Sequence, residues 1–288
     1  MDMQNLLPSV QPFLSIQGQL CECPIWDARK QVLYWTDIDA GRLYSYDWHS
    51  RETQPIYEGP KVGGFTLQEN GELLLFREKD VALRKQDGSV VSVRPFAEEG
   101  DVRFNDVCAD PAGRVFAGTI GKTNDSGSLY QFETDGHYRR IISGTRIANG
   151  ITFSRDLKTL YWVCSTRRKI FAFPYSQEKG IEGEPAVFFE NGEGDGLPDG
   201  LTSDAEGNLY SIRWEADTYG ILILDSDGKI LGKIKVPAKC TTSATFCGPD
   251  LDCLVITTAR KEGEHRVSDL FLLEKMPVRG REEFRSRF

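Results

Sequence analysis

The segment Trp26-Asp-Ala-Arg-Lys-Gln-Val-Leu-Tyr-Trp-Thr36 joins a polar turn to a short apolar strand. A further apolar strand, Arg42-Leu-Tyr-Ser-Tyr46, follows it along the chain. Apolar runs of this length, separated by short polar turns, are typical of antiparallel hairpins. The segment therefore predicts a small antiparallel sheet, and any repeat of the segment predicts another.

Six copies of this unit occupy the 288-residue chain. In each copy the strand after the first turn begins at an aliphatic residue, and successive copies are 41 to 49 residues apart. These strands begin at Leu33, Leu74, Val115, Leu160, Leu209 and Leu254. Six sheets of this size fit the blades of a β-propeller, in which radial packing protects the strand edges.

The fold that we expect is therefore all-β: a six-bladed β-propeller formed by a single domain over residues 1–288. The segment Phe13-Leu-Ser-Ile-Gln17 precedes the first complete unit, and we expect it to supply the outer strand of the last blade and close the ring. A β-sandwich is the alternative, but it does not predict six evenly spaced copies.

Composition limits the classes of function. The chain is 40% hydrophobic and carries a net charge of −8 with no basic block, which argues against a nucleic-acid partner. No apolar run approaches the roughly 18 to 20 residues of a membrane span. The first residues lack the basic and apolar regions of a secretory signal. We expect a cytoplasmic protein that acts on a small molecule.

Cysteine and histidine usage narrows the chemistry further. The seven cysteines are odd in number and form no Cys-x-x-Cys pair, so free thiols are expected rather than disulfides. The three histidines, His49, His137 and His265, are far apart in the sequence and form no zinc motif. Any metal ion would therefore be held mainly by oxygen.

Polar residues interrupt the first strand of several units at matching positions. All six first strands of a propeller begin at the same mouth of the central channel, so matching positions converge in space. Counting back five residues from each first turn gives Glu22, Asn105, Asn149, Asp199 and, in the last unit, Thr245, while the second unit has Gly63 and Gly64 nearby. Two carboxylates and two amides are thus expected together, with Arg103 beside them.

Charged side chains gathered in a narrow channel are costly unless they are compensated, and a bound cation is the natural compensation. An all-oxygen set suits Ca²⁺, Mg²⁺ or Mn²⁺ and tolerates Zn²⁺ or Fe²⁺ with waters completing the shell. The alternative is that these residues only cap turns, because Asp and Asn favour strand ends.

Four short motifs carry a family resemblance. They are Cys21-Glu-Cys-Pro-Ile-Trp26, Arg103-Phe-Asn-Asp106, Ala148-Asn-Gly-Ile151 and Pro198-Asp-Gly-Leu201. In this order they resemble the SMP-30/gluconolactonase/regucalcin-like family, six-bladed propellers that hydrolyse sugar lactones with one divalent metal ion. The resemblance implies that Glu22, Asn149 and Asp199 are metal ligands and that Arg103 and Asn105 bind the substrate.

The chain departs from the family pattern at several positions. Cys21 and Cys23 flank Glu22 where the family usually has glycine. In an extended strand their side chains would point away from Glu22, so we expect them to be packing thiols. Cys164 stands where members often have Asp, and Lys122 follows the strand after which members often place an acidic substrate contact.

The reaction that we expect is metal-assisted hydrolysis of an aldonolactone to the open aldonic acid. Asp199 is the candidate for a double role, as a metal ligand and as the general base that activates water. Asp106 is expected to support the site rather than to act directly. Two alternatives remain: a non-catalytic calcium-binding or regulatory propeller, and a related metal-dependent esterase or phosphotriesterase.

The C-terminal stretch Arg279-Gly-Arg-Glu-Glu-Phe-Arg-Ser-Arg287 is mixed in charge. A run of this kind is usually a solvated end of the chain, and we expect it to be one here.

Overall fold

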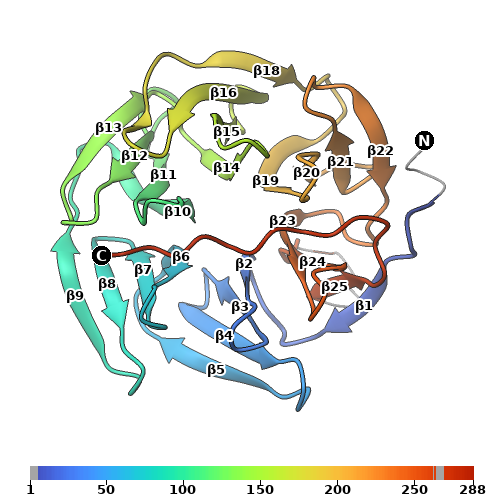
Figure 1. Ribbon diagram of the computed structural model, residues 1–288, viewed down its shortest axis with the longest axis horizontal. Coiled ribbons are helices and arrows are strands. Elements are labelled where there is room, and N and C mark those ends of the chain that lie inside the picture. Colours follow the sequence, from blue (N-terminus) through green and yellow to red (C-terminus); the bar gives the residue numbers. More distant parts are fainter. Residues whose placement is uncertain (1–5, 262, 264–268) are drawn as a thin grey trace.

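The computed structural model describes residues 6–261, 263 and 269–288. Its strands form six antiparallel sheets that stand around a central channel, as Figure 1 shows along the short axis of the molecule. The six-bladed β-propeller is confirmed. The described residues contain no α-helix. They therefore include no helix that is long and apolar enough to cross a membrane.

Within each blade the strands follow one another outward from the channel. Blades 1 to 6 are numbered in the order of their inner strands, which are β2 (Cys21–Asp27), β6 (Val62–Leu67), β10 (Asp101–Ala109), β14 (Ala148–Phe153), β19 (Leu197–Ser203) and β23 (Thr241–Cys247). The second strands are β3 (Val32–Asp37), β7 (Leu73–Arg77), β11 (Val115–Gly121), β15 (Thr159–Cys164), β20 (Leu209–Trp214) and β24 (Cys253–Thr258).

Third and fourth strands complete the blades. The third strands are β4 (Arg42–Asp47), β8 (Asp80–Arg84), β12 (Ser128–Phe132), β16 (Lys169–Ser176), β21 (Ile221–Leu224) and β25 (Leu270–Leu273). The outer strands are β5 (Thr53–Glu58), β9 (Val90–Pro95), β13 (Tyr138–Ser143), β18 (Ala186–Glu190), β22 (Ile230–Ile234) and β1 (Gln11–Leu14). Blade 4 also carries the two-residue strand β17 (Gly180–Ile181), which pairs with the end of β16.

The N-terminal strand closes the ring, as expected. Strand β1 pairs antiparallel with β25, with Gln11 opposite Leu272, and so supplies the outer strand of blade 6. The observed strand ends at Leu14, three residues before the end of the predicted segment.

The hydrophobic core is divided into clusters that lie between neighbouring blades. Between blades 2 and 3, for example, the rings of Phe76 and Phe104 meet edge to face with centroids 5.1 Å apart. Because each inner strand is covered on both faces, strands such as β2 are buried along their whole length. Polar residues in these strands therefore stand out as candidates for function.

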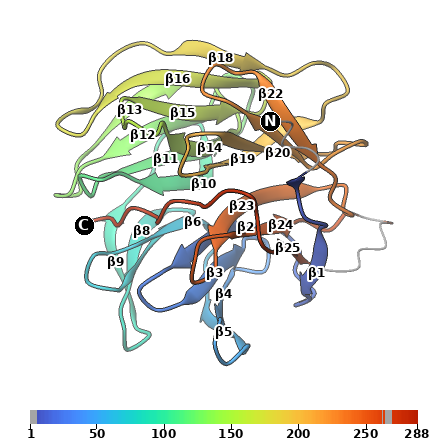
Figure 2. The same cartoon turned by 45° about the vertical axis from the view of Figure 1, so that its right-hand side comes forward.

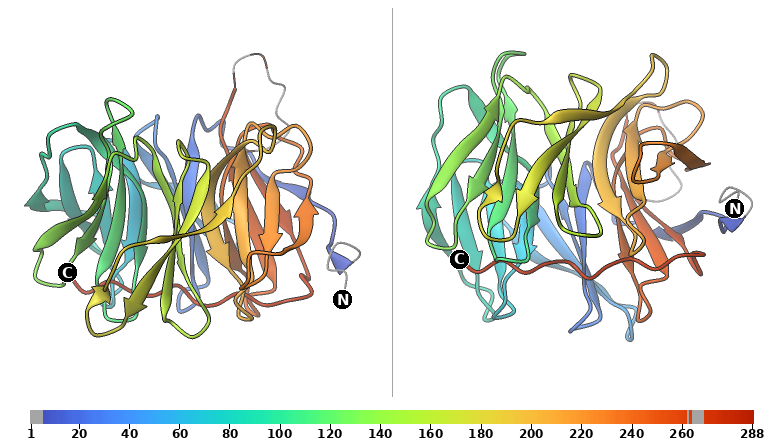
Figure 3. Two further views of the ribbon diagram at one scale, coloured as in Figure 1. Left: turned by 90° about the horizontal axis from the view of Figure 1, so that it is seen from above. Right: turned by 45° about the horizontal axis from the view of Figure 1, so that its top comes forward.

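The two faces of the ring differ. We call the face at which the inner strands begin the entrance face, and the opposite one the tail face. The last ten residues, 279–288, which we call the tail, run across the tail face (Figures 2 and 3). Backbone bridges join the tail to the ring at two distant points, Gly280 to Asp204 and Ser286 to Gln68.

Candidate active site

Every inner strand has a β-bulge at the same depth in the channel. In five blades, two residues of the inner strand stand opposite one residue of the second strand, whereas blade 2 has a single extra residue. The bulged residues are Cys23 and Pro24, Gly63, Asn105 and Asp106, Asn149 and Gly150, Asp199 and Gly200, and Thr242 and Ser243. Bulges redirect side chains and are frequent beside active sites. The six bulges form a ring around the channel, which we call the bulge ring.

The bulge ring holds the residues that the sequence singled out. Asn105, Asn149 and Asp199 are the first bulged residues of their strands, and Glu22 immediately precedes the bulge of β2. Neighbouring inner strands touch here, because a Cβ added to Gly200 would lie 2.7 Å from the Cα of Ser243. Glycine is required at this position for the strands to converge.

A chain of hydrogen bonds orients the amide side chains. The Arg103 guanidinium donates to Asn105 Oδ1 over 2.8 Å, and Asn105 Nδ2 donates to Asn149 Oδ1 over 2.6 Å. Asn149 Nδ2 then donates to Ser165 Oγ over 2.8 Å, and Ser165 donates to the carbonyl of Pro198 over 2.6 Å. Three blades are thereby linked, and the last acceptor immediately precedes Asp199.

The carboxyl groups of this region repel one another. Burial and then the nearby Asp199 raise the pKa of Glu22 well above its usual range, and burial followed by Asp106 does the same for Asp199. Burial also raises the pKa of Asp106, to about 7. Arg103 opposes all three shifts. Three acids thus face one another with a single nearby cationic side chain.

Oxygen atoms are available for a metal ion. Glu22 Oε2 is buried without a hydrogen-bond partner. Among the described residues, no three His, Cys, Asp or Glu side chains are grouped as a metal site by themselves, so a set at this point would include an amide oxygen. His49 and His137 are exposed on the outside of the ring, and His265 lies outside the described residues.

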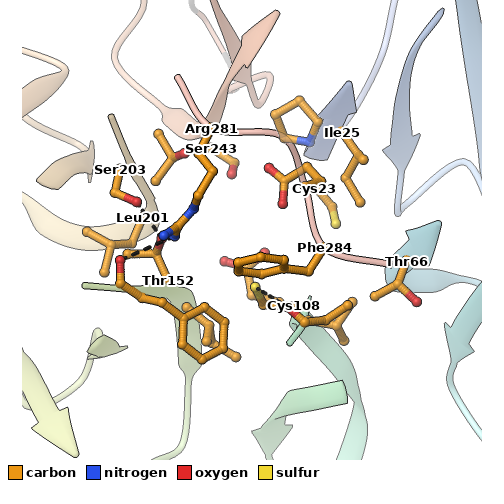
Figure 4. Close-up of a pocket in the computed structure, with 18 of the residues that line it drawn as sticks. Cys23, Ile25, Thr66, Cys108, Thr152, Leu201, Ser203, Ser243, Arg281 and Phe284 are labelled. Carbon is orange, nitrogen blue, oxygen red and sulfur yellow. Dashed lines mark hydrogen bonds between the residues drawn. The ribbon is translucent and has the colours of Figure 1, made fainter. Parts of the chain in front are cut away.

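A small chamber lies in the channel between the bulge ring and the tail (Figure 4). Its volume of about 70 Å³ has room for a few water molecules. Cys23, Asp106 and Ser243 line it from the bulge ring, and Arg281 and Glu283 line it from the tail. The tail thus stands across the far end of the channel that begins at the candidate site.

The expectation that the tail is a solvated end is wrong. Ser286 is fully buried, and the ion pair between Arg285 and Asp27 leaves these side chains only 8% and 1% exposed. Thr245 Oγ1 donates to Glu283 Oε1 over 3.3 Å. The mixed charges that resembled a solvated end instead meet partners across the channel, which a one-dimensional pattern cannot show.

Two smaller expectations also need correction. Thr245 was expected at the mouth, but in blade 6 the bulge falls at Thr242 and Ser243, and Thr245 lies deeper, next to the tail. Cys23 was expected to alternate with Glu22, but it lies in the bulge with a left-handed φ of 49°, and its thiol lines the chamber. Because bulges shift the alternation of side chains, counting along the chain fails at these two positions.

The other unusual cysteines are packing residues. Cys21 is fully buried in a cluster with Trp26 and Trp35, and Cys164 is fully buried in the cluster of blades 3 and 4. All seven cysteines are reduced, as expected.

Sequence reasoning missed Ser165 and the chamber residues Arg281 and Glu283. Ser165 follows β15 in a turn with no motif of its own, so nothing in the sequence connected it to Asn149. The tail residues were visible as charges, but their position in the channel depends on the path of the chain across the tail face.

Comparison with known proteins adds a second line of evidence. A sequence model of the SMP-30/gluconolactonase/LRE-like region matches residues 20–260. Pentonolactonase XacC of Haloferax volcanii is 36% identical over 279 residues, which cover 93% of this chain and 94% of that protein. A 6-deoxy-6-sulfogluconolactonase of Pseudomonas putida is 31% identical, with 84% of each chain covered.

Solved structures agree with the fold. The crystal structure of a calcium-binding protein, regucalcin, from Agrobacterium tumefaciens superimposes with a TM-score of 0.84 at 25% sequence identity. The superposition covers 96% of this chain and 95% of that one.

Proposed function

This chain belongs to the SMP-30/gluconolactonase/LRE-like family, and we propose that it hydrolyses a sugar lactone to the open aldonic acid with one divalent cation bound at the bulge ring. Two relatives, the pentonolactonase and the sulfogluconolactonase, support a sugar lactone as the class of substrate. The nearer of these two in sequence acts on pentonolactones by its name, so the first substrates to test are pentono-1,4-lactones, followed by hexonolactones.

The observation that carries the proposal is the unbalanced charge at the bulge ring. Burial raises the pKa of all three carboxyl groups, the neighbouring acids raise those of Glu22 and Asp199 further, one guanidinium opposes these shifts, and Glu22 Oε2 is buried with no hydrogen-bond partner. A divalent cation would relieve both the repulsion and the unsatisfied oxygen, because carboxylate and amide oxygens are its usual ligands. In this proposal Glu22, Asn149 and Asp199 hold the cation, with waters completing its shell.

The cation, when bound, would polarise the lactone carbonyl and stabilise the negative charge that develops on its oxygen. Asp199 would take a proton from the attacking water, since a carboxylate with a raised pKa is a stronger base than an ordinary one. The chain of bonds from Asn149 through Ser165 to the Pro198 carbonyl would hold the backbone beside Asp199 in place during this step.

Arg103 and Asn105 would orient the sugar. The Arg103 side chain is already directed by its bonds to the Phe104 carbonyl and to Asn105 Oδ1, both 2.8 Å long. Its remaining N–H groups would donate to hydroxyl oxygens of the lactone. A polyhydroxylated ring needs several such contacts to present one carbonyl to the base.

Acid release from a panel of lactones in a pH-stat tests the proposal directly. We expect release that is abolished by EDTA and restored by adding back one of Ca²⁺, Mn²⁺, Zn²⁺, Mg²⁺ or Fe²⁺. Elemental analysis of protein purified without chelator would identify the ion. The absence of cation-dependent acid release from every lactone would refute the proposed activity.

One observation favours a second candidate. The Agrobacterium structure that superimposes on this chain is described as a calcium-binding protein, which supports calcium as the bound ion; the second candidate is a propeller whose function is that binding alone. In that case calorimetry would detect Ca²⁺ binding that is lost on substituting Glu22, while every lactone stays intact.

A further inference from the structure

One chain of hydrogen bonds runs through blades 3, 4 and 5 at the bulge ring, and each of its two ends can act in only one sense. The first group is the Arg103 guanidinium, which has donors but no acceptor. The last group is the backbone carbonyl of Pro198, which has no donor. Asn105, Asn149 and Ser165 lie between them, in that order. The two ends therefore determine the direction of every hydrogen bond in the chain.

The carbonyl end determines what the Ser165 hydroxyl does. Ser165 Oγ lies 2.6 Å from the carbonyl oxygen of Pro198, and two oxygens at this distance need a proton between them. The single hydroxyl proton is thereby used, so Ser165 Oγ can only accept from its other neighbour, the Asn149 amide 2.8 Å away. The amide atom that faces Ser165 must be Nδ2, and Oδ1 therefore points to the opposite side of the amide.

The arginine end leads to the same orientation. Arg103 donates to Asn105 Oδ1, so Nδ2 is on the other side of the Asn105 amide. That nitrogen donates to the Ala148 carbonyl over 3.0 Å and to Asn149 Oδ1 over 2.6 Å. Asn149 and Ser165 are only 5% and 3% exposed, so bulk water is not at hand to replace either partner. Asn149 Oδ1 keeps a second lone pair for a cation.

We propose that Ser165 is a positioning residue for the cation site, because it sets which end of the Asn149 amide faces the cation. The inference rests on the cation proposed at the bulge ring. A divalent cation binds an amide through its oxygen, whereas the NH₂ end would repel it. Without the Ser165 hydroxyl, Asn149 Nδ2 loses its acceptor and the reversed amide becomes accessible. Asn105 still favours the original orientation, so the loss of cation affinity should be limited.

The backbone of the turn holds Ser165 in place for this role. Its N–H donates to the Ile147 carbonyl over 3.2 Å, and its own carbonyl accepts from the Arg168 N–H over 3.0 Å. Ser165 belongs to blade 4, and its hydroxyl reaches β19 of blade 5 at the residue before Asp199. One hydroxyl thus connects two of the proposed ligands, because it accepts from Asn149 and donates to the backbone next to Asp199.

Cation affinity, measured by calorimetry on chelator-treated protein, tests this role without any lactone. Ca²⁺, Mn²⁺ and Zn²⁺ are titrated separately. We expect Ser165→Ala to bind the cation about tenfold more weakly than the wild type, as is typical when the partner of a metal ligand is removed. Ser165→Thr, which keeps the hydroxyl, should bind within about threefold of the wild type.

Ser203→Ala is the matched control. Ser203 and Thr152 share a buried hydrogen bond of 3.0 Å that also links blades 4 and 5, but this bond lies outside the chain that reaches Asn149. Its loss should leave cation affinity within about twofold of the wild type. Circular dichroism verifies folding. Should Ser165→Ala fail to fold, Ser165→Cys takes its place, because a thiol is only a weak donor and acceptor.

A second background separates orientation of the amide from general support of the fold. Asn149→Asp offers an oxygen at both ends of the side chain, so its orientation no longer matters. In this background the additional change Ser165→Ala should weaken cation binding by less than about twofold, against about tenfold in the presence of Asn149. Equal losses in the two backgrounds would show that Ser165 only supports the fold, and would overturn the proposal.

The same titrations distinguish this inference from the proposed function. A wild-type protein that binds a cation, with unchanged affinity in Ser165→Ala, overturns the role of Ser165 and leaves the cation site standing. A wild-type protein that binds none of the three ions overturns both. A tenfold loss in Ser165→Ala that disappears beside Asn149→Asp supports the proposed role, whether or not the protein hydrolyses lactones.

Discussion

The two halves of the central channel both contain carboxyl groups, but they balance them differently. In the tail half, Asp27 pairs with Arg285. Burial raises the pKa of Glu283, and Arg281 and the hydrogen bond from Thr245 oppose that rise. In the entrance half, the bulge ring gathers Glu22, Asp106 and Asp199 around a single guanidinium.

This difference separates structural acids from candidate functional ones within one fold. The tail supplies its own cationic side chains to the acids of its half. Each half has one buried carboxylate oxygen without a hydrogen-bond partner, Asp27 Oδ2 and Glu22 Oε2, but of these two carboxylates only that of Asp27 forms an ion pair within the described part of the chain. The fold supplies cationic side chains to the buried acids of the tail half but only one to the three acids of the bulge ring. An external cation is therefore expected at the bulge ring.

The largest effect should come from exchanging one acid in each half. Asp199→Asn should reduce turnover about a thousandfold at saturating metal, because it removes the proposed base and one ligand. Glu283→Gln, which removes an acid of the tail half, should keep turnover within about threefold. Steady-state acid release measures both, with circular dichroism to verify folding. Similar losses in the two variants would remove the functional distinction between the halves.

The tail half should matter for stability instead. Arg285→Met leaves the Asp27 carboxylate buried and unpaired, and should lower the free energy of unfolding by about 3 kcal/mol. Arg287→Met, an exposed change on the same tail, should lower it by less than about 0.5 kcal/mol. Urea unfolding monitored by fluorescence provides the comparison. A stable Arg285→Met protein would mean that the tail does not fasten the ring.

Proton competition should distinguish the halves as well. Because the pKa values of Glu22, Asp199 and Asp106 are raised, to about 7 for Asp106, protons should compete with the cation for these groups at higher pH than for ordinary carboxyl groups, and metal affinity should fall as pH falls. Metal affinity should change roughly tenfold per pH unit for each proton that is released on binding. Calorimetry in buffers of different ionisation enthalpy measures the number of protons released. Glu283→Gln should leave the proton count unchanged, and a pH-independent affinity would contradict the proposed ligands.

The same raised pKa values determine whether the metal-free protein becomes more or less stable as pH rises. A carboxyl with a raised pKa binds its proton more tightly in the folded state, so stability is present at low pH and is lost as pH rises from about 4 to 7. Thermal unfolding in EDTA should therefore show Tm falling over this window in the wild type and falling less in Asp106→Asn. An identical pH dependence in the two proteins would rule out Asp106 as a source of the effect.

The smallest effect is expected at the boundary between the halves. Cys23→Gly relieves a left-handed backbone and should change the free energy of unfolding by less than about 1 kcal/mol. Cys21→Gly, in the regular part of the same strand, removes a fully buried side chain and should cost about 2 kcal/mol. Equal costs for the two changes, measured by urea unfolding, would show that the strain at Cys23 is negligible.

The repeat of turns and apolar strands was sufficient to predict the six blades and the closing role of the N-terminal strand. Both depend on local patterns, since a hairpin is specified by its own turn and its own side-chain alternation. Counting from the turns also brought Asn105, Asn149 and Asp199 to corresponding positions, because their strands have bulges at the same offset from the turn.

Counting failed where that offset changes. In blade 6 the bulge lies one residue farther from the last paired residue, Cys247, than in blades 3 to 5. The turn residue from which the count started, Asp250, lies three residues beyond Cys247 instead of one, so the count reached Thr245 instead of Thr242. The bulge at Cys23 likewise turned a thiol that alternation had directed elsewhere. A bulge is set by the close approach of neighbouring blades, and a single strand carries no signal for it.

The chain's own sequence determined the ring, its number of blades and the kinds of side chain available at its mouth, because these follow from short-range patterning. Only the tertiary structure decided which charges meet: those of the tail with those of the channel, and the acids of the bulge ring with one another. These contacts join residues tens to hundreds of positions apart, and the energy of a charge depends on its distance to others and on its exclusion from water. The distances between these charges and their exclusion from water are set only when the ring closes.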